Sequence, residues 1–152
     1  MLTQARKHLI DKTFQAIGDA RRCIVHLYNS TSPAQREIVF KKTPQEIIAL
    51  AVDGVKMVRD RASEVNCDII LEYSPESFST TEIDYAVEVC EAVKQQWNKT
   101  CKDKIILNLP TTVECSTPNA FADQIEYFCT HISDRKNVII SLHNHNDRGE
   151  GV

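Results

Sequence analysis

The chain has 152 residues, of which 42% are hydrophobic and 26% charged, as in an ordinary soluble globular protein. This length suffices for one domain with a substantial core but is short for two. A net charge of −3 excludes a broad basic surface, so we expect no nucleic-acid partner. No apolar run approaches the roughly 18 residues of a membrane span, and the amino-terminal stretch is too polar for a secretory signal.

The cysteines are widely and irregularly spaced, and no CxxC pair occurs. There are six of them: Cys23, Cys67, Cys90, Cys101, Cys115 and Cys129. Without a signal peptide the expected compartment is reducing, so the spacing indicates structural thiols rather than a disulfide framework. We therefore expect a cytoplasmic protein.

The first predicted element is a helix over residues 5–17. A short apolar strand follows at Cys23–Tyr28, and after a polar loop the residues Thr43, Pro44 and Glu46 predict a helix start. Threonine as N-cap, proline at the first helical position and glutamate at the third together form a capping box. The helix that it opens has apolar residues at helical spacing: Ile47, Ile48, Ala51, Val52, Val55 and Val58.

The same plan then repeats. A second strand is predicted at Cys67–Tyr73, and Ser79 with Glu82 predicts a second capping box. The helix after it has this apolar stripe: Ile83, Ala86, Val87, Cys90, Val93 and Trp97. A third strand at Lys104–Leu109 precedes a helix that begins at Thr117-Pro118, and a fourth strand is predicted over residues 137–142.

Apolar strands that alternate with amphipathic helices predict an α/β fold with parallel strands covered by helices. A doubly wound sheet usually carries a glycine-rich nucleotide motif, but this chain has four glycines and neither GxGxxG nor a P-loop. The (β/α)8 barrel places its chemistry at the carboxyl ends of its strands. Unusual polar residues stand there in this chain: His26, Ser74, Glu76, Asn108, Thr112, His143 and His145. Because a barrel needs eight strands and about 250 residues, we expect one domain that forms about half a barrel, with four or five parallel strands.

Two of the five histidines, His143 and His145, stand two residues apart directly after an apolar run. On a strand, residues i and i+2 point to the same face, so the two imidazoles would lie side by side. This geometry suits a metal site, although two ligands do not complete one. The alternative is a pair of exposed polar residues at a strand end.

Four strand-end motifs resemble the 2-isopropylmalate synthases of the DRE-TIM metallolyase superfamily. They are "HLYNSTS" (residues 26–32), "EYSPESF" (72–78), "NLPTTVE" (108–114) and "SLHNHNDRG" (141–149). The resemblance extends over essentially the whole chain, in order and with similar spacing. It implies a metal-dependent acyltransferase that condenses acetyl-CoA with 3-methyl-2-oxobutanoate to give 2-isopropylmalate and CoA. This reaction is the first committed step of leucine biosynthesis.

The resemblance also implies roles for individual residues. His143 and His145 are similar to two of the divalent-metal ligands, and Thr112 to the residue that holds the oxoacid carboxylate. Glu76 matches a catalytic position near the reacting ketone. Other polar residues match the lining of the same cavity: His26, Ser74 and Asn108.

The implied cofactor is a divalent metal, with acetyl-CoA as co-substrate. Imidazole and oxygen ligands suit Mg, Mn or Zn, so the sequence does not select among them. Asn146 or Asp147 would orient the ligating rings through hydrogen bonds. The resemblance further implies that full-length members form homodimers. If the chain came from a fungus, the location would be mitochondrial, with the targeting segment outside this sequence.

Other parts of the family pattern are expected to lie outside residues 1–152. They are the strand with an Arg-Asp-Gly motif, the last strand, the helical subdomain and the leucine-binding regulatory domain. On this basis we expect residues 1–152 to be the central part of the catalytic barrel. We also expect the isolated chain to be inactive, because the aspartate ligand of the Arg-Asp-Gly motif and the base for acetyl-CoA are missing from it. It should be oligomeric, aggregated or poorly folded, because half a barrel leaves strand edges and an apolar inner face uncovered.

Two alternatives remain open. One is a related condensing enzyme, a homocitrate or citramalate synthase. The other is a non-catalytic truncated copy.

Overall fold

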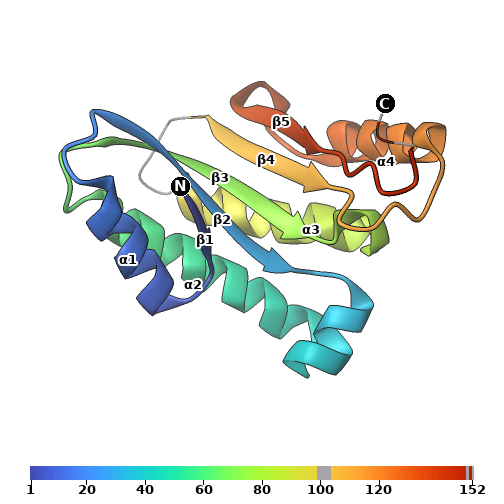
Figure 1. Cartoon of the computed structure of the whole chain (residues 1–152), viewed down its shortest axis with the longest axis horizontal. Helices are drawn as coiled ribbons and strands as arrows, with labels where there is room; N and C mark the ends of the chain where they lie inside the picture. The colour runs from blue at the N-terminus through green and yellow to red at the C-terminus, as the bar shows by residue number, and fades with distance from the viewer. Residues whose placement is uncertain (99–103, 150, 152) are drawn as a thin grey trace.

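Five parallel strands form one sheet in the computed structural model, which describes residues 1–98, 104–149 and 151 (Figure 1). The strands are β1 (Leu2–Gln4), β2 (Arg22–Ser30), β3 (Asp68–Glu76), β4 (Ile105–Pro110) and β5 (Val138–His143). Four of them match the predicted strands, and β1 is the additional fifth strand. Their order in the sheet, β1-β2-β3-β4-β5, is the order in the chain. In a doubly wound sheet the strand order reverses at one point, whereas in a (β/α)8 barrel each strand lies next to the one before it in the chain. The observed order is that of a barrel, so the prediction of a partial (β/α)8 barrel is confirmed.

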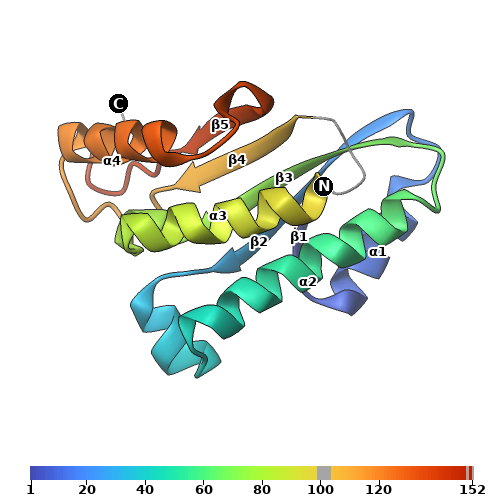
Figure 2. The ribbon, with the colours of Figure 1, turned by 180° about the vertical axis from the view of Figure 1, so that it is seen from behind.

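All four α-helices pack against one face of the sheet, as Figure 2 shows from behind. They are α1 (Lys7–Ile17), α2 (Pro44–Ala62), α3 (Ile83–Trp97) and α4 (Pro118–His131). Three short turns complete the described elements: the π-helical turn η1 (Gln35–Phe40) and the 3-10 turns η2 (Phe78–Thr80) and η3 (Arg135–Asn137). We call the face under the helices the covered face and the opposite one the open face.

Strand residues alternate between these two faces. On the covered face, the core contains side chains with no solvent exposure: Val25, Leu27, Leu71, Tyr73, Leu107 and Leu109. On the open face, apolar side chains remain accessible, with Leu2 64%, Ile24 40% and Ile139 45% exposed. Within the described residues, β1 and β5 each have a single neighbouring strand. The predicted uncovered inner face is therefore present.

Of the two predicted capping boxes, one is confirmed and the other is wrong, while the predicted helix start at Thr117-Pro118 is confirmed. Glu46 donates its amide to Thr43 Oγ1 at 3.3 Å, and Thr43 donates its amide to Glu46 Oε2 at 2.8 Å, so the first capping box forms. In contrast, α3 begins at Ile83 and Ser79 lies in η2, where its hydroxyl donates to the Val113 carbonyl at 2.8 Å. The Glu82 carboxylate instead accepts two bonds from the buried Arg36 guanidinium, at 2.7 and 2.9 Å. A tertiary ion pair thus takes the place of the local cap.

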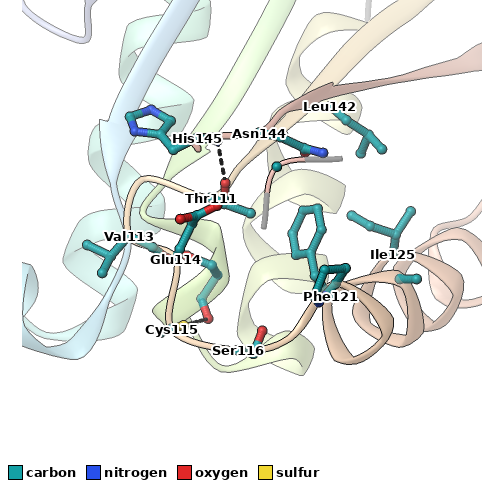
Figure 3. Close-up of a pocket in the computed structure, with 14 residues that line it drawn as sticks. Thr111, Val113, Glu114, Cys115, Ser116, Phe121, Ile125, Leu142, Asn144 and His145 are labelled. Carbon is teal, nitrogen blue, oxygen red and sulfur yellow. Dashed lines mark hydrogen bonds between the residues drawn. The ribbon is translucent and has the colours of Figure 1, made fainter. Parts of the chain in front are cut away.

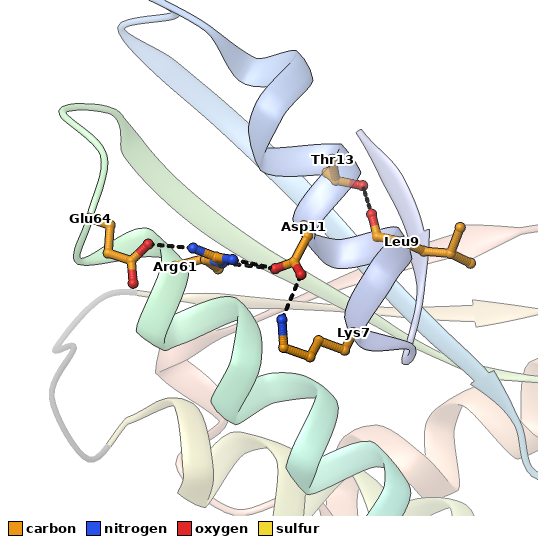
Figure 4. A network of polar contacts seen from close by, with 6 residues as sticks. All are labelled: Lys7, Leu9, Asp11, Thr13, Arg61 and Glu64. Atoms are coloured by element: carbon orange, nitrogen blue, oxygen red, sulfur yellow. Dashed lines mark hydrogen bonds and ion pairs between the residues drawn. The ribbon is translucent and has the colours of Figure 1, made fainter.

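An ion-pair network joins α1 to α2 (Figure 4). Asp11 accepts from Lys7 at 2.7 Å within α1 and from Arg61 at 2.6 and 2.9 Å across to α2. Glu64 accepts from the same guanidinium at 2.7 Å. Hydrogen bonds from Lys7 and then from Arg61 lower the pKa of Asp11. Because water reaches all of these side chains at least in part, we expect each pair to contribute little to stability.

The five cysteines within the described residues are free thiols, and Cys101 lies outside that part of the chain. Cys90 is fully buried on the apolar stripe of α3, and this burial raises the pKa of its thiol. No helix within the described ranges is both long and apolar enough to cross a membrane.

Candidate functional site

A cavity of about 540 Å³ opens at the carboxyl ends of β2, β3, β4 and β5 on the open face. It is lined by Leu2, His26, Tyr28, Glu72, Ser74, Glu76, Asn108, Pro110, Thr112, Leu142, His143 and His145. All seven polar residues that the sequence analysis placed at strand ends are among these. Parallel strands bring their carboxyl ends to one edge, and the two-residue repeat of a strand presents alternate side chains to one face. These two rules account for the convergence.

Ser74 is the centre of a hydrogen-bond network across three strands. Its Oγ lies 2.7 Å from His26 Nε2, and Asn108 Nδ2 donates to the same Oγ at 2.8 Å. Since Asn108 supplies one hydrogen to this oxygen, Ser74 is free to donate its own hydrogen to Nε2. The network is satisfied when the ring proton of His26 is on Nδ1, which faces Glu72 Oε1 at 3.7 Å.

The protonation of this network follows from its burial. Burial, followed by nearby positive charge that includes His143, lowers the pKa of His26. Burial raises the pKa of Glu72, although the same positive charges oppose the shift. His26 Nδ1 and Glu72 Oε1 are 3.7 Å apart, which is within salt-bridge distance but too long for a hydrogen bond. Both pKa shifts favour the neutral forms of the two side chains. We therefore describe His26 as a neutral imidazole held by Ser74, rather than as one half of an ion pair.

Glu76, at the end of β3, is held by the neighbouring strand. Ser30 of β2 is its register partner and donates its hydroxyl to Glu76 Oε2 at 2.7 Å. The Thr31 amide and hydroxyl donate to the Glu76 carbonyl at 3.0 and 3.1 Å. The carboxylate is thus fixed at the cavity wall with its second oxygen available to another donor.

Thr112 lies in the loop after β4 and lines the same cavity as Glu76. Its Oγ1 accepts a hydrogen bond from the Ser77 amide at 3.0 Å. Because a hydroxyl both accepts and donates, this bond leaves the hydrogen of Thr112 free to donate to a ligand oxygen. A carboxylate in the cavity would be a suitable acceptor.

His143 and His145 lie side by side at the edge of the cavity. Their ring centroids are 5.0 Å apart and the planes are inclined by 44°. His143 is the last residue of β5, and His145 stands in the loop that follows. His145 is half-buried and His143 is exposed.

The two residues predicted to orient these rings behave differently. Asp147 Oδ2 lies 3.5 Å from His145 Nδ1, within reach of an electrostatic contact. Asn146 instead accepts the Gly151 amide with Oδ1 at 2.9 Å, so its side chain stabilises the local turn. Asp147 therefore lies near the ring of His145 at an ion-pair distance, and its orienting role stays a prediction.

The histidine pair has the donor chemistry of a divalent-metal site but supplies only two ligands. In the part of the chain that the structure describes, no group of three or more His, Cys, Asp or Glu side chains could hold a metal ion. Two adjacent imidazoles suit Mn or Zn, and Mg would need more oxygen ligands. The remaining coordination positions would need water, substrate or other protein groups.

A second cavity of about 270 Å³ adjoins the first and shares Leu142 and His145 with it (Figure 3). Apolar side chains from α4 and the loop after β4 line it, including Phe121, Ile125 and Val113. Two polar residues of this loop, Thr111 and Glu114, are buried in its wall.

The sequence analysis did not single out several residues at these cavities: Tyr28, Glu72, Thr111 and Glu114. A signal existed for Glu72, because Glu72, Ser74 and Glu76 follow the two-residue repeat of one strand face. Tyr28 follows His26 by the same rule. In contrast, Thr111 and Glu114 occupy an irregular loop, and only the tertiary structure shows which way they point.

Comparison with known proteins agrees with this architecture. A family model described as HMGL-like matches residues 1–152. Among the curated proteins that the chain resembles are 2-isopropylmalate synthases of three bacteria. That of Clostridium acetobutylicum is 52% identical over 152 residues, which are 98% of this chain and 27% of the relative. Those of Pseudomonas fluorescens strain Pf0-1 and Acetoanaerobium sticklandii are 54% and 50% identical over 153 residues, covering 100% of this chain and 27% of each relative.

The chain thus spans about a quarter of the length of these relatives, whereas the family model covers it from end to end. The parallel sheet with helices on one face and the strand-end cavity agree with the barrel that the four motifs imply. On these grounds the chain belongs to the HMGL-like family.

Proposed function

We propose that this chain forms the oxoacid- and metal-binding part of a 2-isopropylmalate synthase. The single observation that carries the proposal is the convergence of seven polar residues on one cavity at the carboxyl ends of four strands. The printed names of the relatives support the choice of this enzyme. The length of the match supports the assignment of residues 1–152 to one part of a longer enzyme. That this part is the centre of the catalytic barrel is inferred from the motifs.

The proposed reaction joins acetyl-CoA to 3-methyl-2-oxobutanoate. The acetyl methyl carbon loses a proton and forms a bond to the ketone carbon, and the ketone oxygen takes up a proton. Water then cleaves the thioester and releases CoA with 2-isopropylmalate.

His143 and His145 would hold the divalent metal, Mg, Mn or Zn. When bound, such an ion supplies Lewis acidity that polarises the ketone carbonyl of a 2-oxoacid. The chain contributes two imidazoles whose ring centroids lie 5.0 Å apart, and Asp147, 3.5 Å from the ring of His145, would orient that ring.

The other residues of the cavity would bind the oxoacid. Thr112 has a hydroxyl hydrogen free for the substrate carboxylate, because its oxygen already accepts from Ser77. Glu76 presents one unshared carboxylate oxygen toward the reacting ketone, where it would hold a proton or a hydroxyl. His26, whose pKa is lowered by burial and whose ring is held by Ser74, would present an uncharged side chain to the substrate.

Calorimetric titration with Mn²⁺ tests the proposal, with and without 3-methyl-2-oxobutanoate. We expect binding in the wild-type protein, tighter with the oxoacid, and its loss in a His143→Ala/His145→Ala double variant. His8→Ala is the matched control, because His8 is exposed on α1 far along the chain from the site. Equal Mn²⁺ binding in the double variant and the wild type would refute the metal site.

Release of free CoA with a panel of 2-oxoacids tests the reaction. Preference for 3-methyl-2-oxobutanoate supports the proposed enzyme, and preference for another 2-oxoacid would favour a homocitrate or citramalate synthase. We expect no turnover from the 152-residue chain alone, because its described part supplies only two metal ligands.

A further inference from the structure

We propose that Thr111 and Glu114 are positioning residues that set the spacing of the two histidines by holding the backbone on both sides of His145. We call this pair the β4 clamp, because both residues follow β4. The inference rests on the proposed function, in which His143 and His145 are metal ligands. It adds two residues that neither touch the metal nor line the oxoacid cavity.

Thr111 fixes the backbone between the two histidines. The β4–β5 ladder ends at the pair Pro110–His143, and the Thr111 amide then donates to the His143 carbonyl at 3.0 Å. The hydroxyl of the same residue accepts the His145 amide at 2.8 Å (Figure 3). The backbone amide and the buried hydroxyl of this one residue therefore hold the two peptide groups that flank Asn144. Because each imidazole extends from this backbone, its path decides how far apart the two rings lie.

Glu114 holds the other end of the same loop. Its Oε2 accepts the backbone amide of Arg148 in a short hydrogen bond, and the Arg148 guanidinium donates to the Glu114 carbonyl at 3.3 Å. Glu114 is only 7% exposed, and within the described residues its Oε1 is buried without a hydrogen-bond partner. A buried carboxylate is costly unless it is compensated. Here its charge faces the amide that ends the histidine loop.

The neighbouring threonine shows that the β4 loop serves two sides of the cavity. Thr112 Oγ1 accepts from Ser77, in the loop after β3, whereas Thr111 Oγ1 accepts from His145, in the loop after β5. The two hydroxyls therefore connect opposite walls of the cavity. Thr112 is proposed to contact the substrate, and Thr111 would act only through the histidines.

The test compares Thr111→Val with Thr111→Ser and Glu114→Ala with Glu114→Gln. Valine keeps the shape of threonine but removes the acceptor, whereas serine and glutamine each keep an acceptor oxygen. We expect the Kd for Mn²⁺ to rise by about 10- to 100-fold in Thr111→Val and Glu114→Ala, as for other groups that orient metal ligands. The serine and glutamine variants should restore most of the affinity. Rescue in Thr111→Ser, whose side chain is smaller than that of valine, is a result that a role for side-chain volume alone would not produce.

Amide hydrogen exchange in the metal-free protein provides a second readout. The His145 amide should exchange at least about tenfold more slowly than the exposed Asn144 amide, because it donates to a buried hydroxyl. This protection should disappear in Thr111→Val while the amide of Leu107, in the core of β4, stays protected. Equal exchange at His145 and Asn144 in the folded wild-type protein would overturn the clamp, even if every variant failed to fold.

The two proposals fail in different ways. If the double histidine variant binds Mn²⁺ like the wild type, the metal site of the proposed function is wrong. If that variant loses Mn²⁺ but Thr111→Val binds it with wild-type affinity, the histidines are ligands and the β4 clamp is wrong.

Discussion

The two faces of the sheet differ although the same strands build both. On the covered face Leu27, Leu71 and Leu107 are inaccessible to solvent beneath the helices. Residues one position away in the chain lie on the open face, where polar groups surround a cavity of about 540 Å³. Each strand thus alternates between a residue that stabilises the fold and a residue available for chemistry. The comparison shows how a chain can change its site without repacking its core.

The two faces contribute differently to stability, because folding buries apolar side chains on one face and polar side chains on the other. A large aliphatic side chain on the covered face contributes about 1.5–3 kcal/mol through burial. The polar groups on the open face gain little on folding and must instead be satisfied by one another, as Ser74 satisfies His26 and Asn108.

A pair of substitutions on opposite faces tests whether the two faces differ in their contribution to stability. Leu107→Ala should lower the free energy of unfolding by about 2–5 kcal/mol, because it leaves a cavity in a fully buried region. Ile24→Ala, at a site 40% exposed on the open face, should cost about 1 kcal/mol or less. Urea denaturation of the two variants measures both values. Similar losses would mean that the open face is packed in solution.

A smaller effect is expected from the network on the open face. Ser74→Ala leaves the Asn108 amide and His26 Nε2 without their shared partner in a largely buried position, which should cost about 1–3 kcal/mol. Ser63→Ala is a suitable control, since Ser63 is exposed after α2 and bonds only its own turn. Urea denaturation of both variants measures the change in the free energy of unfolding. A Ser74→Ala variant as stable as the wild type would show that water replaces the hydroxyl.

The smallest effect concerns pH. Burial lowers the pKa of His26 below its ordinary value of 6.5, so the folded state favours the neutral ring. The stability from this ring should be fully present above pH 6.5 and should be lost as the pH falls below 6.5 and through the folded-state pKa. NMR titration of the His26 ring should give a midpoint below 6.5, with exposed His8 as the reference. A midpoint above 6.5 would mean that the Glu72 contact prevails as an ion pair.

Much of the fold was predictable because it depends on local patterns. The helix start at Thr43 needs only residues within one turn, and the predicted capping box forms. Ser79 and Glu82 have the same sequence pattern, but this capping box does not form. The Glu82 carboxylate instead binds Arg36, which is 46 residues away in the chain. A local rule holds only where no tertiary partner competes with it.

The positions of the candidate site residues were also predictable, whereas their partners were not. Strand ends and the two-residue repeat placed His26, Glu76 and His143 on one rim. Their catalytic, substrate-binding and metal-binding roles stay predictions. The bonds of Ser30 to Glu76 and of Thr111 to His145 join different strands or loops, and no spacing in the sequence indicates them.

The sequence by itself determined the alternation of strands and helices, the face on which each strand side chain lies and the end of the sheet at which chemistry gathers. These follow from the periods of the helix and the strand, which act over a few residues. The tertiary structure decided that Ser74 would join three strands, that Glu72 would face His26 and that Thr111 would hold the histidine loop. Such contacts depend on the packing of segments far apart in the chain, where small differences in backbone path select each partner.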